Sequence, residues 1–457
     1  MLKIKKILIA TVVICSVWGN VNGANLQEKI QQIIARKDQQ KVEYTISIID
    51  PQDGKVVYSH NAAKPLTPAS NMKIVTSFTT LKQLGTNYKF VTTAGLVGNK
   101  LVVIGCGDPL LGYDGKNFVS QIVEALKAKS ITQLDGIIID SSIFDNECVH
   151  PNWPRTQINR SYSCEVNGLN YNGNCIKISA AVNNGKLNLT KSPDTEFLKM
   201  LNNVKVITKG DSAIGSNRTQ QENEIIVFGK CRRPASFDVA IERPNLMFGT
   251  LLMESLNRAG INVVNPITEE TVNSPEFQMV TEFETPIIEV LHNCNKDSLN
   301  IAAECMIKLL AAKTSGRAGS WQGGRDAIGS YLQTLGIDKT EFYIDDGSGL
   351  SSINKISSNA LAKILLEAYK SELWATFKES FAIGGVDGTI KKQFYKDKYK
   401  NRVFAKTGYI NGVRAMSGIC IGTNNDKEYI FSIITNHANY PTKTAITNIV
   451  EAIVDEG

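Results

Sequence analysis

The chain has 457 residues, 42% of them hydrophobic, and a formal net charge of +6. Three lysines lie within the first six residues, and subtracting these 3 charges from +6 leaves +3 for the remainder. So small a surplus excludes the strongly basic surface of a nucleic-acid-binding protein. The length exceeds what one simple core needs, so we expect two or three lobes.

The first 23 residues have the pattern of a secretory signal peptide. The early lysines precede a short apolar run over residues 7–18, and Val21 and Gly23 are the small residues that signal peptidase accepts. The run is too short to span a bilayer comfortably. The residues before Cys15 are not the small ones of a lipoprotein signal. We therefore expect cleavage after Gly23 and export to the periplasm or cell envelope.

Helical and strand patterns alternate near both ends of the mature chain. Apolar residues at helical spacing predict helices, and alternating runs bounded by turn residues predict strands. The expected elements are a helix over residues 26–35, strands over 44–49 and 55–58, a helix from 70 to 85, strands over 403–409, 415–422 and 429–435, and a helix over 442–454.

The long middle of the chain differs from the two ends in residue pattern and composition. Residues 90–233 contain short alternating strands with many Gly, Asn and Ser residues, which predicts a β-rich region. Residues 234–260 and 286–314 return to helical spacing. We expect an α+β fold in which residues 24–89 and 234–457 build one antiparallel sheet flanked by helices. Residues 90–233 form an inserted region of one or two lobes.

Cysteine and histidine usage limits the chemistry. Eight of the nine cysteines follow the leader, and Cys164/Cys175 and Cys294/Cys305 are two candidate disulfides among pairings that the sequence does not decide. The four histidines lack an H-E-x-x-H pattern, and there is no G-x-S-x-G elbow. No metal and no organic cofactor is indicated, and hydrolysis would need a base other than histidine.

A Ser-x-x-Lys pattern stands at the start of the helix that begins at residue 70. Residues three apart on a helix share a face, so the Lys73 amine can reach the Ser70 hydroxyl. The helix N-terminus offers free N–H groups to an oxyanion, and a buried lysine loses its proton readily. Ser70 is thus a candidate nucleophile and Lys73 its base. The same spacing at Ser352 and Lys355 lies in a glycine-rich stretch and indicates a polar loop.

A Lys-Thr-Gly pattern lies within the strand predicted over 403–409. Lys406 supplies a cation, Thr407 a hydroxyl, and Gly408 leaves room for a substrate backbone. A third pattern, Ser-x-Asn, is weak by itself because it recurs along the chain. It begins at residues 255, 298, 352 and 357.

The three patterns occur in the order typical of penicillin-binding proteins. Four longer segments make the match more specific. The chain resembles the D-alanyl-D-alanine carboxypeptidase/endopeptidase family of penicillin-binding protein 4. The resemblance covers nearly the whole mature chain and is least distinct over about 173–230. It rests on GCGDP at 105–109, DGSGL at 346–350, GGVDGT at 384–389 and AKTGYINGVRAMSG at 405–418.

The resemblance implies a penicillin-binding/β-lactamase-like transpeptidase fold with a five-stranded sheet. It also implies that Ser70 is the nucleophile, Lys73 its base, and Ser298 the proton relay to the leaving D-alanine nitrogen. Asn300 would orient the lysine and the substrate carbonyl. We assign the Ser-x-Asn motif to Ser298 rather than Ser255 because residue 298 opens a predicted helix, whereas Ser255 lies within one and indicates surface.

The resemblance likewise implies the substrate contacts. Lys406 and Thr407 would bind the terminal carboxylate beside Gly408, and the backbone N–H groups of Ser70 and Tyr409 would form the oxyanion hole. The implied partners are peptidoglycan stem peptides and β-lactam antibiotics, the latter as covalent inhibitors. A serine β-lactamase and a non-catalytic wall-binding protein are the alternatives, and a homo-oligomer stays open.

Three further positions are ambiguous. Asp346 and Asp387 stand beside glycines, which favours turn-capping over catalysis. Members of the family often carry tryptophan and acidic residues near the cleft. The corresponding residues 152–156 (NWPRT) contain Trp153 but no acid, which leaves recognition of a cross-linking amino side chain open.

Overall fold

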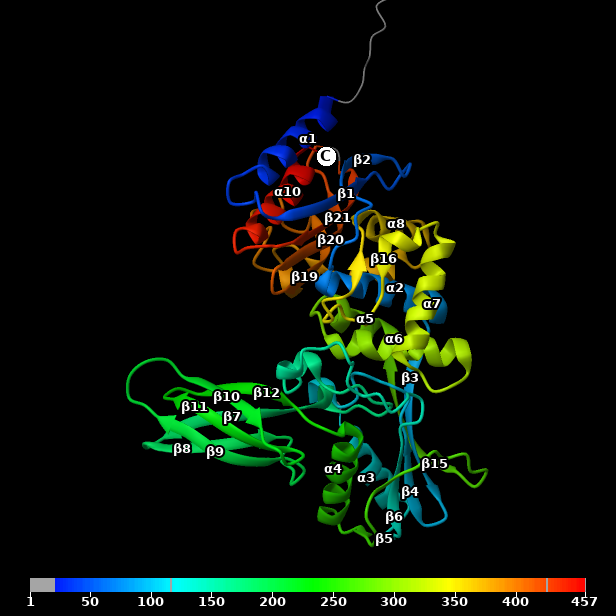
Figure 1. Ribbon diagram of the computed structural model, residues 1–457. Helices are drawn as coiled ribbons and strands as arrows, with labels where there is room; N and C mark the ends of the chain where they lie inside the picture. The colour runs from blue at the N-terminus through cyan, green and yellow to red at the C-terminus, as the bar shows by residue number, and fades with distance from the viewer. Residues whose placement is uncertain (1–20, 116, 425, 457) are drawn as a thin grey trace, which may run out of the picture.

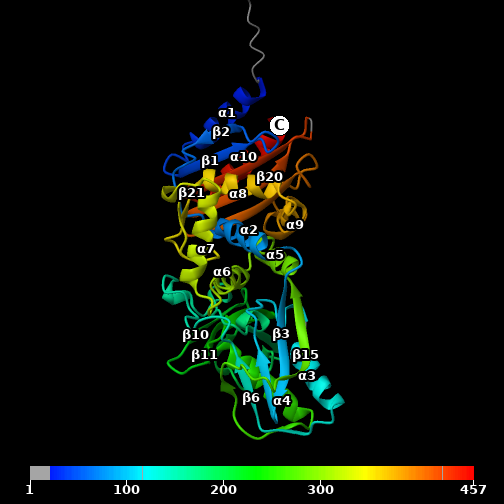
Figure 2. The same ribbon diagram turned by 90° about the vertical axis from the view of Figure 1, so that its right-hand side faces the viewer.

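The structure is a computed structural model that describes residues 21–115, 117–424 and 426–456. The predicted leader, apart from its last three residues, lies outside this part. Figure 1 shows an elongated molecule in which one lobe holds both ends of the described chain and a second lobe holds the middle. A layer of helices lies between the two, as the perpendicular view in Figure 2 also shows.

The first lobe contains a six-stranded sheet in the order β18-β19-β20-β21-β1-β2, with every neighbouring pair antiparallel. Both chain ends contribute, because Glu43 of β1 pairs with Asn436 of β21. The five expected strands are present, and the two-residue strand β18 extends the sheet at one edge. The strands are β1 (Glu43–Ile49), β2 (Val56–His60), β18 (Ala382–Ile383), β19 (Val403–Ile410), β20 (Val413–Ile421) and β21 (Glu428–Asn436).

Helices cover both faces of this sheet. Helices α1 (Val21–Ile34) and α10 (Thr442–Glu456) contact each other and share a core with one face. Helix α2 (Met72–Leu84) lies on the other side, where its residues 72–81 are all buried because the neighbouring helices enclose it. These neighbours are α5 (Ile287–Asn295), α6 (Asn300–Ser315), α7 (Trp321–Thr334), α8 (Ser358–Lys370) and α9 (Trp374–Glu379).

The helical spacing over 286–314 is divided between two helices, and the second is the helix predicted to open at Ser298. Helix α5 ends at Asn295 and α6 begins at Asn300. Between them Ser298 has a φ of 63°, a left-handed conformation that interrupts helical hydrogen bonding. The break exposes the start of α6, and it places Ser298 at that start.

The second lobe is built on a five-stranded sheet in the order β14-β6-β4-β3-β15, with two helices in its core. A two-stranded pair, β5 (Gln133–Leu134) and β13 (Asn262–Val263), adjoins it. The elements are β3 (Lys89–Val97), β4 (Lys100–Ile104), α3 (Phe118–Ala128), β6 (Gly136–Asp140), α4 (Pro244–Arg258), β14 (Thr268–Glu269) and β15 (Gln278–Pro286).

The predicted end of the insertion after residue 233 is wrong. Helix α4 buries Met247, Phe248 and Leu252 in the core of the second lobe. Strand β15 pairs with β3 along the edge of the same sheet. The insertion therefore extends to Pro286, where the chain enters α5.

Two three-stranded sheets complete the insertion and project to one side in Figure 1. One has the order β12-β7-β8 and the other β10-β11-β9. The helical spacing expected from residue 234 is wrong for its first part, which is strand β12. The strands are β7 (Cys175–Asn183), β8 (Lys186–Ser192), β9 (Lys199–Val206), β10 (Ala213–Arg218), β11 (Glu224–Cys231) and β12 (Ala235–Ala240).

Neither candidate disulfide is present, since all eight cysteines in the described part of the chain are free thiols. Within the same ranges, no helix has the length and apolar character needed to cross a membrane.

Candidate active site

Ser70 lies in a short turn, Ala69–Asn71, that leads directly into α2. One helical turn later, Lys73 is fully buried, and its Nζ donates to Ser70 Oγ at 3.0 Å. The same ammonium donates to Asn300 Oδ1 at 2.7 Å and to the Ser348 carbonyl at 2.9 Å. Three acceptors from three segments thus fix the amine beside the hydroxyl.

Burial changes the acidity of this lysine. Loss of hydration lowers the pKa of Lys73 to about 8, although the nearby Cys294, Glu304 and Asp346 act in the opposite direction. An amine with this pKa is partly neutral near neutral pH. It can therefore accept the proton of the Ser70 hydroxyl without histidine.

A second buried lysine faces the break between α5 and α6. Lys406 Nζ donates to Ser298 Oγ at 2.8 Å and to the Thr407 carbonyl at 2.7 Å. Burial, and next the charge of Lys73, hold the pKa of Lys406 well below its usual value. Thr407 Oγ1 donates to Thr389 Oγ1 at 2.9 Å, so the GGVDGT segment also reaches this strand.

Strand β19 lies against the turn that carries Ser70. A Cβ atom on Gly408 would stand 2.6 Å from the Pro68 carbonyl oxygen and 3.2 Å from the Asn71 nitrogen. Only glycine therefore permits the strand to approach the turn this closely. The next residue, Tyr409, is 62% exposed, and its ring lies 3.8 Å from the Arg414 guanidinium.

A buried carboxylate that the sequence did not reveal supports the position of Lys73. Glu304 lies one turn after Asn300 on α6 and is fully buried. Its Oε1 accepts from Ser348 N at 2.8 Å, and its Oε2 accepts from Gly347 N at 3.1 Å and from Trp321 Nε1 at 2.7 Å. Glu304 thereby fixes the backbone whose carbonyl holds Lys73. Burial, then the charge of Asp346, raises the pKa of Glu304 to about 7.

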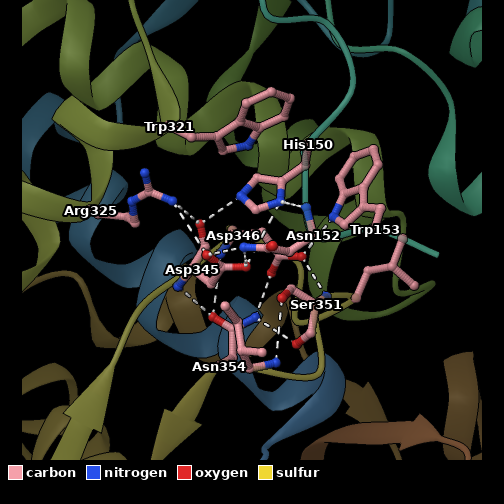
Figure 3. A network of polar contacts seen from close by, with 12 residues as sticks. His150, Asn152, Trp153, Trp321, Arg325, Asp345, Asp346, Ser351 and Asn354 are labelled. Atoms are coloured by element: carbon pink, nitrogen blue, oxygen red, sulfur yellow. Dashed lines mark hydrogen bonds and ion pairs between the residues drawn. The ribbon is translucent and has the colours of Figure 1, made fainter. Parts of the chain in front are cut away.

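Asp346 caps the loop after β16 (Phe342–Tyr343), as predicted, and Figure 3 shows its contacts. Its Oδ1 accepts from Gly349 N at 2.7 Å, and its Oδ2 accepts from Ser351 N at 2.7 Å and from Trp153 Nε1 at 2.8 Å. Asp387 also caps a turn, because its Oδ1 accepts from Ile383 N at 2.8 Å.

The segment around Trp153 reaches this loop from the inserted lobe. The indole of Trp153 and the side-chain amide of Asn152 both donate hydrogen bonds to the loop. Trp153 is only 3% exposed, and the neighbouring Asn152 donates to both carboxylate oxygens of Asp345 at 3.1 Å. Figure 3 shows both side chains directed into the polar network around Asp345 and Asp346.

The other matches to the two serine patterns are not part of this site. Ser255 lies on α4 of the second lobe, where its hydroxyl accepts from Arg258 Nη2 at 3.2 Å. Ser352 is exposed, and Lys355 donates to Thr67 Oγ1 at 2.9 Å. The polar loop predicted for these two residues is what the structure shows.

A serine hydroxyl beside a buried lysine of lowered pKa, placed between an antiparallel sheet and a helical layer, is the arrangement typical of serine hydrolases of the lysine-dependent type. The model of the D-Ala-D-Ala carboxypeptidase 3 (S13) family matches residues 26–455. The chain belongs to this family, and the resemblance found in its motifs is confirmed.

Curated relatives and solved structures agree with this assignment. The D-alanyl-D-alanine carboxypeptidase of Actinomadura sp. (strain R39) is 25% identical over 94% of this chain and 85% of its own length. The D-alanyl-D-alanine carboxypeptidase DacB of Haemophilus influenzae is 21% identical over 92% of this chain and 89% of its own length. The crystal structure of penicillin binding protein 4 from H. influenzae has a TM-score of 0.79 at 20% identity, and covers 95% of this chain and 100% of that one. The expected penicillin-binding fold is confirmed.

Proposed function

We propose that this protein is a serine-type D-Ala-D-Ala carboxypeptidase that acts on peptidoglycan stem peptides through an acyl-enzyme on Ser70. The observation that carries the proposal is the 3.0 Å contact between the fully buried Lys73 Nζ and Ser70 Oγ. Membership of the S13 family and the activities named for the relatives support the same reaction.

The proposed reaction begins with the neutral amine of Lys73. It takes the proton of Ser70 as Oγ attacks the carbonyl of the penultimate D-alanine, and Asn300 holds the amine in place through its Oδ1. The backbone N–H groups of Ser70 and Tyr409 stabilise the oxyanion. Ser298 then relays a proton to the leaving nitrogen, the C–N bond breaks, and water hydrolyses the ester to free Ser70.

Substrate binding in this proposal depends on the two residues that precede Gly408. Lys406 supplies a positive charge and Thr407 a hydroxyl to the terminal carboxylate. A β-lactam carries a carboxylate and a reactive carbonyl, so it acylates Ser70 in the same position. No metal and no organic cofactor takes part in any step.

We further propose that the protein acts in the cell envelope after removal of the leader. The charge and apolar pattern of residues 1–23 supports export, and the substrate lies outside the cytoplasm. Nucleic acid is not a proposed partner, and a homo-oligomer is compatible with the proposal.

The test is the release of D-alanine from a pentapeptide by the wild type and by Ser70→Ala. Loss of the nucleophile should reduce kcat by roughly a thousandfold or more, because no acyl-enzyme can form. Circular dichroism and thermal unfolding would verify that the variant is folded. Release that continues unchanged in folded Ser70→Ala would exclude Ser70 as the nucleophile.

A further inference from the structure

A small hollow of about 160 Å³ lies behind strand β19, on the face that the helix α10 also covers. Gly408 faces the turn that carries Ser70, so Thr407 and Tyr409, its neighbours along the strand, face the other way and line this hollow. Arg414 of β20 is the register partner of Tyr409 and lines the hollow too. The register places Arg414 diagonal to Thr407 on one face of the sheet, within reach of a long side chain.

The hollow offers positive charge and hydrogen-bond donors. Among its described lining residues none is acidic. Arg414 is half-buried, and neither it nor Lys443 of α10 forms an ion pair with a residue of the described ranges. Gln393 is only 9% exposed, and its Oε1 accepts from Thr447 Oγ1 at 3.0 Å, while its Nε2 has no acceptor among the residues that the structure describes. Such a set of groups complements an anion.

The hollow reaches the edge of β19 along which a substrate would lie. Within the described chain, β18 pairs with β19 no further along than Ala405, so residues 406–410 have a free strand edge. Thr389, in the turn that follows β18, lines the hollow and accepts a hydrogen bond from Thr407 Oγ1 at 2.9 Å. An anion held beside Thr407 at this edge is therefore within the hollow.

Arg414 supplies a charge that is more permanent than that of Lys406. Lys406 is fully buried and donates to Ser298 Oγ at 2.8 Å, and burial holds its pKa well below the usual value. A guanidinium stays protonated and presents two parallel N–H groups to a carboxylate. The ring of Tyr409 lies 3.8 Å from the Arg414 guanidinium and so supports it over the hollow.

We propose that the hollow takes the terminal α-carboxylate of the substrate and that Arg414 is the residue that selects a free carboxylate there. Thr407 presents its hydroxyl to the carboxylate at the edge of β19, and Arg414 binds the carboxylate from the hollow. This inference rests on the proposed function. It narrows the substrate class to peptides whose leaving residue ends in a negative charge rather than in an amide or an ester.

The experiment uses the full chain and two substrates, a pentapeptide that ends in D-Ala-D-Ala and the same peptide with its terminal carboxylate converted to a carboxamide. Chromatography of the released D-alanine or D-alaninamide gives kcat and KM. We expect Arg414→Gln to lower kcat/KM for the acid about twentyfold, mainly through a higher KM, because the contact forms before the chemical step. For the amide, kcat/KM should stay within about twofold of the wild type.

The matched control is Arg258→Gln, which removes the same charge from an exposed position on α4 of the insertion. It should leave kcat/KM for both peptides at the wild-type value. The amide also measures whether Arg414→Gln is folded and active, since its hydrolysis needs the same nucleophile and base.

Each other outcome overturns a defined claim. An unchanged kcat/KM for the acid in Arg414→Gln overturns the role of Arg414, and so does an equal loss on both peptides, which would mean that Arg414 only maintains the structure of β19. A wild type that cleaves the acid and the amide equally well excludes a carboxylate subsite and leaves the proposed function standing. A wild type that cleaves neither overturns the proposed function itself.

Discussion

At the scale of one residue, Lys73 shows how burial lowers the pKa of an amine. Its side chain is fully buried, and its three hydrogen-bond partners are neutral oxygens rather than an ion-pairing carboxylate. The charged form therefore loses hydration without gaining a direct counter-ion, and the pKa falls to about 8.

This acidity predicts the pH dependence of acylation. Because the neutral amine is the base, the rate constant for acylation by a fluorescent penicillin should rise with pH and level off above an apparent pKa near 8. Stopped-flow or gel-based labelling measures the profile. A rising limb centred near the histidine value of about 6.5 would contradict the assignment.

Glu304 gives a second prediction at this scale. Its negative charge raises the pKa of Lys73, so Glu304→Gln should move the rising limb of the acylation profile to lower pH. It should also reduce the plateau by about tenfold, since an amide cannot accept from all the N–H groups that the carboxylate binds. Glu372→Gln, at an exposed position, is the control. If the maximal acylation rate constant falls while the pH midpoint of the rising limb stays unchanged, Glu304 has a structural role only.

The sequence predicted that Ser70, Lys73 and Lys406 lie close together, because they belong to the Ser-x-x-Lys and Lys-Thr-Gly motifs. It gave no sign of Glu304, although the spacing of four residues from Asn300 places both on one helical face. An acidic residue on a helix ordinarily faces solvent. Only the packing of α7 and the loop after β16 over α6 makes this one buried.

At the scale of elements, the loop over residues 345–351 has no regular secondary structure, yet many contacts hold it in place. Asp346 caps its backbone, and Gly349 has a φ of 81° with no space for a Cβ, which would stand 1.8 Å from the Ala69 carbonyl oxygen. Trp153 ties the loop to the inserted lobe through Asp346. The loop in turn presents the Ser348 carbonyl to Lys73.

Replacement of Trp153 by Phe tests this connection. Removing one N–H donor from a buried carboxylate should lower the free energy of unfolding by about 1.5–3 kcal/mol and slow acylation, because the loop that fixes Lys73 loosens. Urea unfolding and penicillin labelling measure the two effects. Trp374→Phe is the control, since that half-buried indole N–H donates no hydrogen bond to any residue that the structure describes. Equal stability and equal labelling for Trp153→Phe would show that the contact to Asp346 is dispensable.

Most helices and strands were predictable because their apolar residues recur at a regular spacing. The elements that differ from the prediction are set by contacts with distant parts of the chain. The strands of the first lobe and helices α2 and α10 follow their apolar patterns. The break at Ser298 does not: this residue is left-handed, and its hydroxyl accepts a hydrogen bond from Lys406 of the distant strand β19. Residues 235–240 became a strand because β7 offers an edge for pairing.

At the scale of the whole molecule, the boundary of the insertion was the hardest feature to predict. Strands β14 and β15 are separated in sequence by more than a hundred residues from the strands with which they pair. Pairing between strands this far apart leaves no local pattern in the sequence. The helical spacing after residue 233 therefore predicts a return to the first lobe, which the structure does not show. The insertion also supplies the Trp153 contact to Asp346 beside the candidate site.

The most direct measurement for the central claim is the location and lifetime of the adduct that benzylpenicillin forms. Intact-mass spectrometry followed by peptide mapping should find one penicilloyl group on the peptide that contains Ser70, stable for longer than the labelling reaction, and none on Ser70→Ala. An adduct on another serine, such as Ser298, or equal labelling of Ser70→Ala would contradict the account. Rapid turnover of the drug without an accumulating adduct would instead identify a β-lactamase.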